Sequence, residues 1–379
     1  MRKEHSVKLH ILKTLSDGGF HSGEMLGQQL GISRAAIAKH IKGLNDWGVD
    51  IYRIQGRGYQ LAHPLQLLDE TRLKNAISTP VELISVIDST NQYLLEKVSE
   101  SDKGRVCIAE YQAQGRGRRG RQWISPFGTN LYLSMYWRLD AGMAAAMGLS
   151  LVVGIAAVEA LESIGIQGVK LKWPNDIYYQ DKKLAGILVE MSGQAGGAAH
   201  LVIGMGLNIG MPDVQPGIDQ PWTTLNQISN EVSIDRTQLA IRLIDHWKAA
   251  LEEYELTGLG GFVERWNRLD NFIGRPVKLL MGPREIHGVV QGIDQQGGVV
   301  LKTENGLETY IGGEISLRKG TEPLYFLSDT LSTRWLAPLW RIKWALSLVG
   351  RIFNSRLSPL ILRQISFALL FASSTDSCV

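Results

Sequence analysis

The first 45 residues place apolar side chains at the spacing of three short helices. The first segment covers residues 7–15 and the second covers residues 25–30, and glycines follow both of them. The third begins after Ser33, a residue type that caps helices by accepting a backbone hydrogen bond. Its inward-facing positions are large and aliphatic: Ile37, Ile41 and Leu44. The pattern therefore predicts a three-helix module at the N-terminus.

The face of the third segment opposite its apolar stripe is basic. It presents Arg34, Lys39, His40 and Lys42. Residues 49–61 then alternate around Gly56-Arg57-Gly58, which predicts a β-hairpin with a basic tip. Two helices joined by a tight turn, with the second basic on its outside and a hairpin after it, are typical of a winged helix-turn-helix.

This module, residues 1–63, carries nine basic and five acidic side chains. Because the basic ones gather on the third helix and the hairpin, DNA binding is favoured over a packing module whose charges only face solvent. Phosphate contacts are expected from Lys39, Lys42 and Arg57, and base contacts from the start of the third helix. The predicted DNA-binding residues are Ser22, Ser33, Arg34, Ala35, Lys39, Lys42 and Arg57.

Beyond residue 63 the pattern changes to strands that alternate with helices. Alternating or short apolar runs predict strands at residues 131–137, 169–173, 184–189 and 201–207. Residues 236–254 have the periodicity of a long amphipathic helix. This combination predicts an α/β domain with a mixed sheet over residues 64–268.

Residues 272–318 alternate like the strands of a small β-barrel, with turns at residues 295–298 and 304–306. A third domain is therefore predicted over residues 269–320, and a chain of 379 residues accommodates three domains. The predicted fold class is α+β and multidomain: a winged helix-turn-helix, a central α/β mixed-sheet domain and a C-terminal β-barrel.

Charge follows the same division of the chain. The formal net charge is +3, with +4 in residues 1–63, −4 in residues 64–320 and +3 in residues 321–379. Charged residues make up 20% and hydrophobic residues 44%, which excludes a mostly disordered or collagen-like chain. Cys107 and Cys378 are the only cysteines, so the sequence offers neither a disulfide framework nor a cysteine-based zinc site.

Residues 141–158 form an uncharged stretch that reaches the lower length limit of a membrane span. They are mainly Ala, Gly and Met with few large aliphatic side chains, so a buried helix is favoured. Residues 1–20 lack the apolar core of a signal peptide, because basic residues interrupt them. We expect a cytoplasmic protein.

Residues 115–120 read Gly-Arg-Gly-Arg-Arg-Gly, the G-x-G-x-x-G spacing of dinucleotide-binding proteins, and Asp140 lies 20 residues beyond. The context does not fit a dinucleotide site. Such a site needs a helix directly after the glycines, whereas residues 122–126 end in Ser-Pro, which turns the chain away from a helix. Arginines on a glycine frame instead suit an anion such as a phosphate or carboxylate: Arg116, Arg118, Arg119 and Arg121. The alternative is a solvated or RNA-binding arginine tract.

Four further segments are turn-like and weak on their own. They are Asp88-Ser89-Thr90-Asn91, Lys172-Trp173-Pro174-Asn175-Asp176, Lys183-Leu184-Ala185-Gly186 and Gly204-Met205-Gly206-Leu207-Asn208. Hydroxyls in the first suit a helix N-cap, and the glycines of the last admit a ligand close to the strand backbone. Together with residues 115–120, and in this order, these segments closely resemble the bacterial family of bifunctional biotin–protein ligases and biotin operon repressors. The resemblance covers residues 1–320.

The resemblance implies a class II synthetase-like catalytic domain, an SH3-like C-terminal barrel and a two-step reaction. The biotin carboxylate attacks the α-phosphate of ATP, which gives biotinoyl-5′-adenylate and pyrophosphate. A lysine of the biotin carboxyl carrier protein then attacks this mixed anhydride. The implied enzyme is a biotin–[acetyl-CoA-carboxylase] ligase with biotin and ATP as substrates and Mg²⁺ accompanying the nucleotide.

The resemblance also assigns roles to residues of this chain. Arg116, Arg118 and Lys183 are expected to be catalytic, because they neutralise the carboxylate and the phosphate. The expected biotin contacts are Ser89, Thr90, Asn91, Gln112, Gly115, Arg116, Gly117, Arg118, Trp123, Lys183, Gly186, Leu188 and Gly204. The expected adenylate contacts are Lys172, Asn175, Asp176, Asn208 and Trp222. Asp176 is also the candidate metal ligand, and Lys278 and Arg318 are expected to reach the nucleotide.

In this family the adenylate is the co-repressor. The resemblance implies that the loaded protein forms a homodimer on a sheet edge, binds operator DNA, and presents the same surface to the carrier protein. Ordering of residues 115–120 and 212–222 over the ligand is the expected switch. The alternative is a non-catalytic biotin-sensing regulator, and the intact cations Arg116, Arg118 and Lys183 favour the enzyme.

Residues 321–379 have no counterpart in the family pattern. They hold three of the ten tryptophans among basic residues, which is also the composition of a segment that lies on a membrane surface. They contain no uninterrupted apolar stretch of spanning length. We favour an appended extension over a membrane contact.

Overall fold

The computed structural model describes residues 3–193, 197–211, 217–229, 234–311 and 315–319. All of them belong to one compact unit, Met1–Pro323. The extension predicted over residues 321–379, and part of the loop at residues 212–222, lie outside the described residues.

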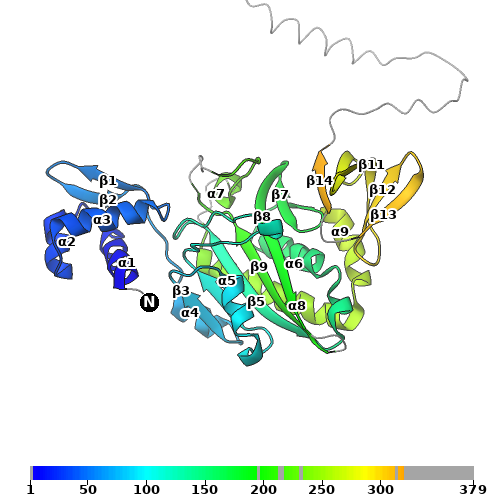
Figure 1. Ribbon diagram of the computed structural model, residues 1–379, viewed down its shortest axis with the longest axis horizontal. Coiled ribbons are helices and arrows are strands. Elements are labelled where there is room, and N and C mark those ends of the chain that lie inside the picture. Colours follow the sequence, from blue (N-terminus) through cyan, green and yellow to red (C-terminus); the bar gives the residue numbers. More distant parts are fainter. Residues whose placement is uncertain (1–2, 194–196, 212–216, 230–233, 312–314, 320–379) are drawn as a thin grey trace, which may run out of the picture. The chain divides into compact units, whose positions relative to one another are not determined.

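The N-terminal module has the predicted three helices and hairpin (Figure 1). They are α1 (Lys3–Leu15), α2 (Gly23–Leu30), α3 (Arg34–Asn45), β1 (Ile51–Ile54) and β2 (Gly58–Leu61). Ser22 and Ser33 accept the backbone hydrogen bonds that cap α2 and α3. The turn between these helices requires Gly27, because a Cβ there would lie 2.6 Å from the carbonyl oxygen of Ile32. The predicted winged helix-turn-helix is confirmed.

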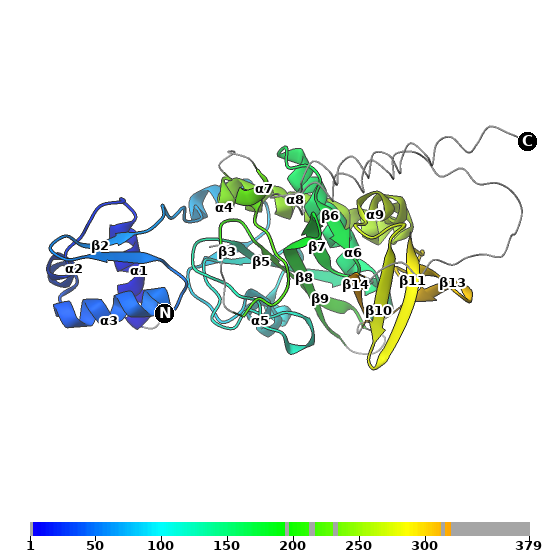
Figure 2. The ribbon, with the colours of Figure 1, turned by 90° about the horizontal axis from the view of Figure 1, so that it is seen from above.

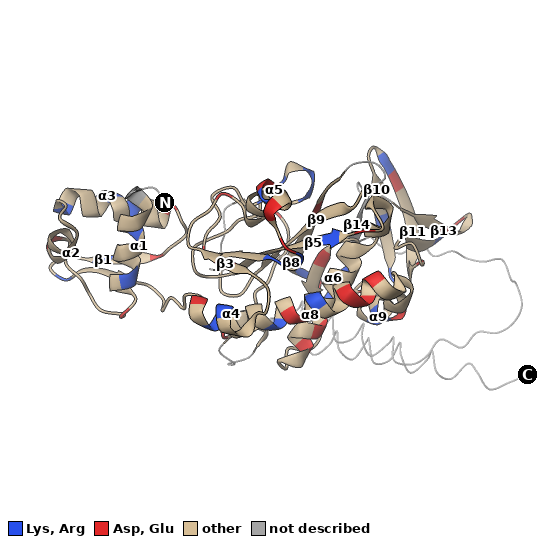
Figure 3. Cartoon of the chain, turned by 90° about the horizontal axis from the view of Figure 1, so that it is seen from below, with Lys and Arg blue, Asp and Glu red and all other residues tan. Residues whose placement is uncertain are grey.

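The core of this module holds the inward-facing residues of α3 as predicted. Ile37, Ile41 and Leu44 are buried against side chains of α1 and α2, namely Ile11, Leu12, Leu15 and Leu26. The outer face of α3 carries Arg34, Lys39 and Lys42 with no acidic residue along the helix (Figure 3).

A mixed seven-stranded sheet forms the central domain, in the order β3-β4-β5-β9-β8-β7-β6. The strands are β3 (Val81–Ile84), β4 (Val106–Ala109), β5 (Leu131–Leu139), β6 (Lys170–Lys172), β7 (Asp176–Tyr179), β8 (Lys182–Ser192) and β9 (Ala199–Leu207). The β3–β4 pair is parallel and the other neighbouring pairs are antiparallel. The predicted mixed sheet is confirmed.

Helices cover both faces of this sheet (Figure 2). On one face, α6 (Leu149–Ser163) and α8 (Arg236–Thr257) pack on each other and on the strands, and on the other face lies α5 (Thr90–Glu96). Successive residues of a strand point to opposite faces of the sheet. On β4, Ile108 packs in the main core and its neighbour Cys107 packs in the cluster under α5. The other helices are α4 (Glu70–Ala76), α7 (Leu225–Ile228), α9 (Val263–Leu269) and the short 3₁₀ turns Val98–Glu100, Arg118–Gly120, Met143–Ala146 and Gly260–Phe262.

The uncharged stretch at residues 141–158 contributes most of α6. Among the described residues, Met143–Ser163 is the one segment long and apolar enough to span a membrane, with a mean hydropathy of 2.0. Most of α6 is nevertheless buried, because it packs against α8 and against β6 and β8 of the sheet. The predicted buried helix is confirmed.

The C-terminal domain is a five-stranded antiparallel sheet in the order β13-β12-β11-β10-β14. Its strands are β10 (Pro276–Met281), β11 (Arg284–Ile293), β12 (Val299–Thr303), β13 (Gly306–Tyr310) and β14 (Ile315–Lys319). The turns predicted at residues 295–298 and 304–306 connect β11 to β12 and β12 to β13. The first turn reaches the central domain, where the Trp173 indole N–H donates to the carbonyl oxygen of Gly297 at 2.9 Å.

Candidate functional site

A pocket of about 1090 Å³ lies over strands β8 and β9. Its walls come from the first turn of α5, from residues 115–123 (the arginine loop), from residues 172–176 between β6 and β7, and from residues 217–222. These walls, together with the two strands, contain residues of all five sequence segments predicted to form the site, although the segments are far apart in the sequence. The fold therefore brings the predicted segments together around one cavity.

The predicted biotin and adenylate contacts between residues 89 and 222 line this pocket, with one exception. The lining includes Ser89, Thr90, Asn91, Gln112, Arg116, Gly117, Arg118, Trp123, Lys172, Asn175, Asp176, Lys183, Gly186, Leu188, Gly204, Asn208 and Trp222. The exception is Gly115, which is buried behind the wall where a Cβ would overlap the carbonyl oxygen of Trp123. Its role is to let the loop pass close to its own far end.

The lining also contains residues that the motifs do not include. They are Gln122, Ile124, Tyr178, Asp181, Met211 and Phe272, among others. Phe272 comes from the start of the C-terminal domain, more than 60 residues beyond the nearest predicted strand of the central sheet. No local pattern marks such a residue, since only the docking of the C-terminal domain brings it to the cavity.

Hydrogen bonds organise the α5 end of the pocket. The side-chain carbonyl oxygen of Gln112 accepts from the N–H and the hydroxyl of Thr90, at 2.9 and 3.1 Å. The hydroxyl of Ser134, fully buried on β5, lies 2.7 Å from Thr90 Oγ1 and 2.6 Å from Asn91 Oδ1. The Asn91 amide donates to the Leu188 carbonyl oxygen at 3.2 Å. Sequence reasoning missed Ser134, which no motif marks.

Two glycines of β9 are required by the side chains that pack against them. A Cβ at Gly204 would overlap the side chain of Asn91, and a Cβ at Gly206 would overlap the ring of Trp123. Neither glycine has a positive φ, so the requirement comes from space and not from backbone conformation. These glycines let the polar end of α5 and the arginine loop close over the strand.

Cations occupy the centre of the pocket with their partners. Lys183 Nζ lies 2.9 Å from Asp176 Oδ1, and the two side chains are 15% and 16% exposed. Arg118 donates to Asn175 Oδ1 at 2.8 Å. Burial lowers the pKa of Arg118, and the neighbouring charge of Arg119 adds to this. An anion placed here would offset the desolvation of these charges.

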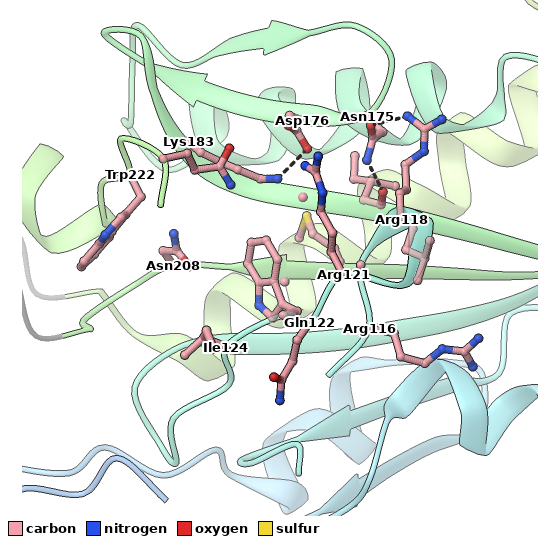
Figure 4. A pocket seen from close by; sticks show the side chains of 18 of the residues that line it. Arg116, Arg118, Arg121, Gln122, Ile124, Asn175, Asp176, Lys183, Asn208 and Trp222 are labelled. Atoms are coloured by element: carbon pink, nitrogen blue, oxygen red, sulfur yellow. Dashed lines mark hydrogen bonds and ion pairs between the residues drawn. The ribbon is translucent and has the colours of Figure 1, made fainter. Parts of the chain in front are cut away.

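The other arginines of the loop point in different directions (Figure 4). Arg121 runs from the loop into the pocket toward Lys183, whereas Arg116 points away from these cations. The Arg116 guanidinium donates to Glu190 Oε1 at 2.5 Å and to Gln92 Oε1 at 2.6 Å. The arrangement therefore holds Arg116 at the edge of the cavity.

Two buried polar atoms without partners belong to side chains that line this pocket. Among the described residues, Trp123 Nε1 and Asn208 Oδ1 are buried and have no hydrogen-bond partner. Both side chains line the pocket. Since buried polar atoms are nearly always satisfied, one free donor and one free acceptor indicate the positions of polar ligand atoms. The Trp222 segment is pinned to β8 beside them, because Lys183 N donates to the Pro221 carbonyl oxygen at 2.9 Å.

The carboxylates of the pocket do not form a metal cage. Within the described ranges, no group of three or more His, Cys, Asp or Glu side chains is placed to hold a metal ion. Asp176 is a single carboxylate close to Lys183. One carboxylate fits Mg²⁺, which proteins commonly bind through one or two carboxylates together with substrate phosphates.

The residues predicted to contact DNA lie on the outer side of the N-terminal module. All seven are exposed: Ser22, Ser33, Arg34, Ala35, Lys39, Lys42 and Arg57. Lys278, expected to reach the nucleotide, forms an ion pair with Glu285 at 2.9 Å and is not among the pocket residues. The side chain of Arg318 lies outside the described part of the chain.

The chain matches the models of three known protein families, one in each domain. Residues 7–60 match the HTH domain, residues 83–208 match the biotin/lipoate A/B protein ligase family, and residues 272–318 match the biotin protein ligase C terminal domain. The matches follow the order of the three domains seen in the structure.

Relatives and solved structures extend this comparison to most of the chain. The chain is 53% identical over 318 residues to the bifunctional ligase/repressor BirA of Salmonella typhimurium, which covers 83% of this chain and 99% of that protein. It is 52% identical over the same length to the bifunctional ligase/repressor BirA of Escherichia coli, with 83% and 98% covered. A biotin protein ligase from Aquifex aeolicus, solved in complex with biotin and ATP, is 31% identical with a TM-score of 0.57 and covers 64% of this chain and 99% of that one. Identity at this level over nearly the whole of a relative means that the chain belongs to the BirA family of bifunctional ligase/repressors.

Proposed function

We propose that this chain joins biotin to a lysine of the biotin carboxyl carrier protein, as a biotin–[acetyl-CoA-carboxylase] ligase, and also represses biotin biosynthesis genes. The observation that carries the proposal is that one pocket holds both Arg118 and Lys183 and a hydrogen-bonded end formed by Thr90 and Gln112. A ligand with a carboxylate at one end and a polar ring at the other suits these two ends.

The first step joins two anions, so it requires positive charge between them. A carboxylate oxygen of biotin attacks the α-phosphorus of ATP, the bond from that phosphorus to the oxygen bridging to the β-phosphorus breaks, and pyrophosphate leaves. Arg118 and Lys183 supply the charge at the centre of the pocket. Their neutral and acidic partners, Asn175 and Asp176, hold them in place before the substrates bind.

Mg²⁺ would neutralise the remaining charge of the triphosphate. Asp176 is the protein carboxylate that would hold it together with the phosphates.

The second step transfers biotin. The uncharged amine of the acceptor lysine attacks the carbonyl carbon of the mixed anhydride, AMP leaves with its phosphate oxygen, and the amine gives up a proton. The unpartnered Asn208 Oδ1 and the nearby Trp222 support an adenylate site at this side of the pocket.

The decisive measurement is biotin-dependent exchange of label between pyrophosphate and ATP. We expect exchange with both substrates and none when biotin is omitted. A purified, folded protein that binds biotin but shows no stimulated exchange would contradict the ligase and support the non-catalytic biotin-sensing regulator.

Repression requires that occupation of the pocket affects the DNA-binding module. The indole of Trp47, just after α3, stacks on Tyr111 with ring centroids 5.2 Å apart and on Phe127 at 5.7 Å. Tyr111 precedes Gln112, which belongs to the pocket. This packing supports a coupling between ligand and DNA module, with biotinoyl-5′-adenylate as co-repressor of operator binding.

We further propose that the loaded protein is a homodimer and that it acts in the cytoplasm, where ATP and the carrier protein are available. Biotin and ATP together are expected to lower the monomer fraction in sedimentation and to tighten operator binding. An equal monomer fraction with and without both ligands would contradict the dimer.

A further inference from the structure

Glu190 lies on β8 at the edge of the pocket and is not one of the lining residues. Its side chain is 19% exposed and both carboxylate oxygens are occupied. Oε1 accepts from the Arg116 guanidinium at 2.5 Å, and Oε2 accepts from the Asn91 amide at 2.9 Å. One carboxylate therefore joins the arginine loop to the first turn of α5.

The two sides of this contact differ in rigidity. Glu190 belongs to a strand that is paired with β9 through Ser192, whereas Arg116 belongs to a loop whose backbone hydrogen bonds are local. Gly117 N donates to the Arg121 carbonyl oxygen and Trp123 N donates to that of Gly115, so the loop is closed on itself. Its side-chain contacts with the strands and with α5 must therefore help to fix its position.

The contact continues as a chain of hydrogen bonds beneath the pocket. From Asn91 it passes through the hydroxyls of Ser134 and Thr90, continues from the Thr90 backbone N–H to Gln112 and on to Ser125, and ends where the Ser125 hydroxyl donates to the carbonyl oxygen of Trp123. Arg116 lies next to one end of the arginine loop, and Trp123 is its other end. Glu190 thus holds one end of the loop, and the buried network holds the other.

We propose that Glu190 is a positioning residue for the adenylation reaction, because it anchors the arginine loop through Arg116 and fixes Asn91 at the biotin end of the pocket. The role in adenylation rests on the proposed function, whereas the anchoring rests on the contacts alone. Only a carboxylate can accept from both partners. A glutamine would turn an N–H toward either the Arg116 guanidinium or the Asn91 amide.

The test compares Glu190→Gln with the wild type in the full chain, both without ligands and with biotin and ATP bound. Trypsin cleavage after Arg118, Arg119 and Arg121 reports how often the loop leaves its place, and we expect a rate about three to ten times that of the wild type. The KM for biotin in pyrophosphate exchange should rise by a similar factor with kcat changed less than about twofold, because the freed loop must be ordered when biotin binds.

A matched control is Glu162→Gln, which removes another half-exposed Arg–Glu pair. Arg268 Nη1 lies 3.0 Å from Glu162 Oε1, and neither residue lines the pocket. Loop cleavage and the KM for biotin are expected to stay at wild-type values in this control, and both variants should keep the thermal midpoint within a few degrees.

Arg116→Gln is an independent test of the same contact if Glu190→Gln folds poorly. Arg116→Gln removes the partner of Glu190 on the exposed loop, so it should raise cleavage after Arg118 and Arg121 by the same factor. Because both changes break the same contact, the double variant Glu190→Gln with Arg116→Gln should show no further rise. Wild-type cleavage rates in the single variants, or fully multiplicative effects in the double variant, would overturn the anchoring. Absence of exchange in the wild type would contradict the proposed function and leave the cleavage comparison valid.

Discussion

At the scale of single residues, the pocket holds its cations in pairs before any substrate is present. Lys183 is paired with Asp176 and Arg118 with Asn175, at 2.9 and 2.8 Å. These partners reduce the cost of holding desolvated charge, and the substrate anions compete with them for the same donors. The motifs along the chain predicted that Arg116, Arg118 and Lys183 act together, whereas Arg116 points away from the other two, and no motif indicated the partners of these cations.

Replacing Lys183 by Gln tests the charge that the adenylation step requires. The biotin-dependent exchange rate is expected to fall by roughly 10²-fold or more, because the developing charge at phosphorus loses a positioned cation. Lys182→Gln is the matched control, since Lys182 is the exposed neighbour on the same strand and does not line the pocket. Equal rates in the two variants would contradict the role of Lys183.

Replacing Gly204 by Ala tests the close packing of β9 against α5. A Cβ would overlap the Asn91 side chain, so Asn91 must move and the biotin end of the pocket changes shape. We expect the KM for biotin to rise by about tenfold or more, on the scale of a lost polar contact. Gly261→Ala, which places its nearest neighbour at 3.6 Å, should leave the KM unchanged. A wild-type KM in Gly204→Ala would show that the packing tolerates a methyl group.

At the scale of elements, the N-terminal module follows almost directly from its sequence. Local signals fix its parts: Ser22 and Ser33 cap helices, Gly27 allows the tight turn, and the apolar stripe of α3 selects its buried face. The same stripe leaves the basic face exposed. Short-range physics therefore determines both the fold of the module and the surface that it offers to DNA.

Lys39 and Lys42 test that surface through the salt dependence of DNA binding. Each Lys→Gln change should weaken binding to duplex DNA and reduce the slope of log K against log salt by about one, because one phosphate contact is lost. Lys302→Gln changes an exposed lysine of the C-terminal domain and should leave the slope unchanged. Equal slopes for all three variants would place the DNA contact elsewhere.

At the scale of the whole molecule, buried charges join elements that are distant in the sequence. Arg236, at the start of α8, is 3% exposed, and its guanidinium lies 2.8 Å from Glu110 Oε2 just after β4. It also donates to the carbonyl oxygens of Gln66 and Asn130, and Glu110 Oε1 accepts from Leu68 N at 2.6 Å. This network ties the segment after the DNA-binding module to the central sheet.

Arg236→Met should destabilise the fold by about 3–5 kcal/mol, because it leaves the Glu110 carboxylate buried without its partner. Adding Glu110→Gln removes that charge while keeping an acceptor for Leu68 N, so the double variant should recover part of the loss. Urea unfolding of the single and double variants measures both effects. A single variant that costs less than about 1 kcal/mol would contradict the network.

Asp270, between α9 and the C-terminal domain, gives the stability a pH dependence of opposite sign to that of most carboxylates. It is 4% exposed, and burial raises its pKa to about 6, although Phe272 N and Trp266 Nε1 donate to it. The folded state then binds the proton more tightly than the unfolded state does. The stabilisation is complete below about pH 4 and is lost as the pH rises through 6, by about 2–3 kcal/mol.

The comparison of wild type with Asp270→Asn isolates this carboxyl group. The difference in free energy of unfolding, wild type minus variant, should fall by about 2–3 kcal/mol between pH 4 and pH 6.5 in urea titrations. A difference that stays constant over this range would mean that the carboxyl group keeps its ordinary pKa in the fold.

The sequence by itself determined the domain order, the winged module, the main strands, the buried helix α6 and most of the motif residues that line the pocket. These depend on periodicity, caps, turns and motif order, which act over a few residues or are preserved as short segments. Tertiary structure alone decided the rest: that Ser134 and Glu190 support the wall, that Phe272 reaches it, and that Arg116 lies on Glu190. Each of these pairs residues from separate elements. A contact of that kind depends on how strands register and domains pack, which no local pattern encodes.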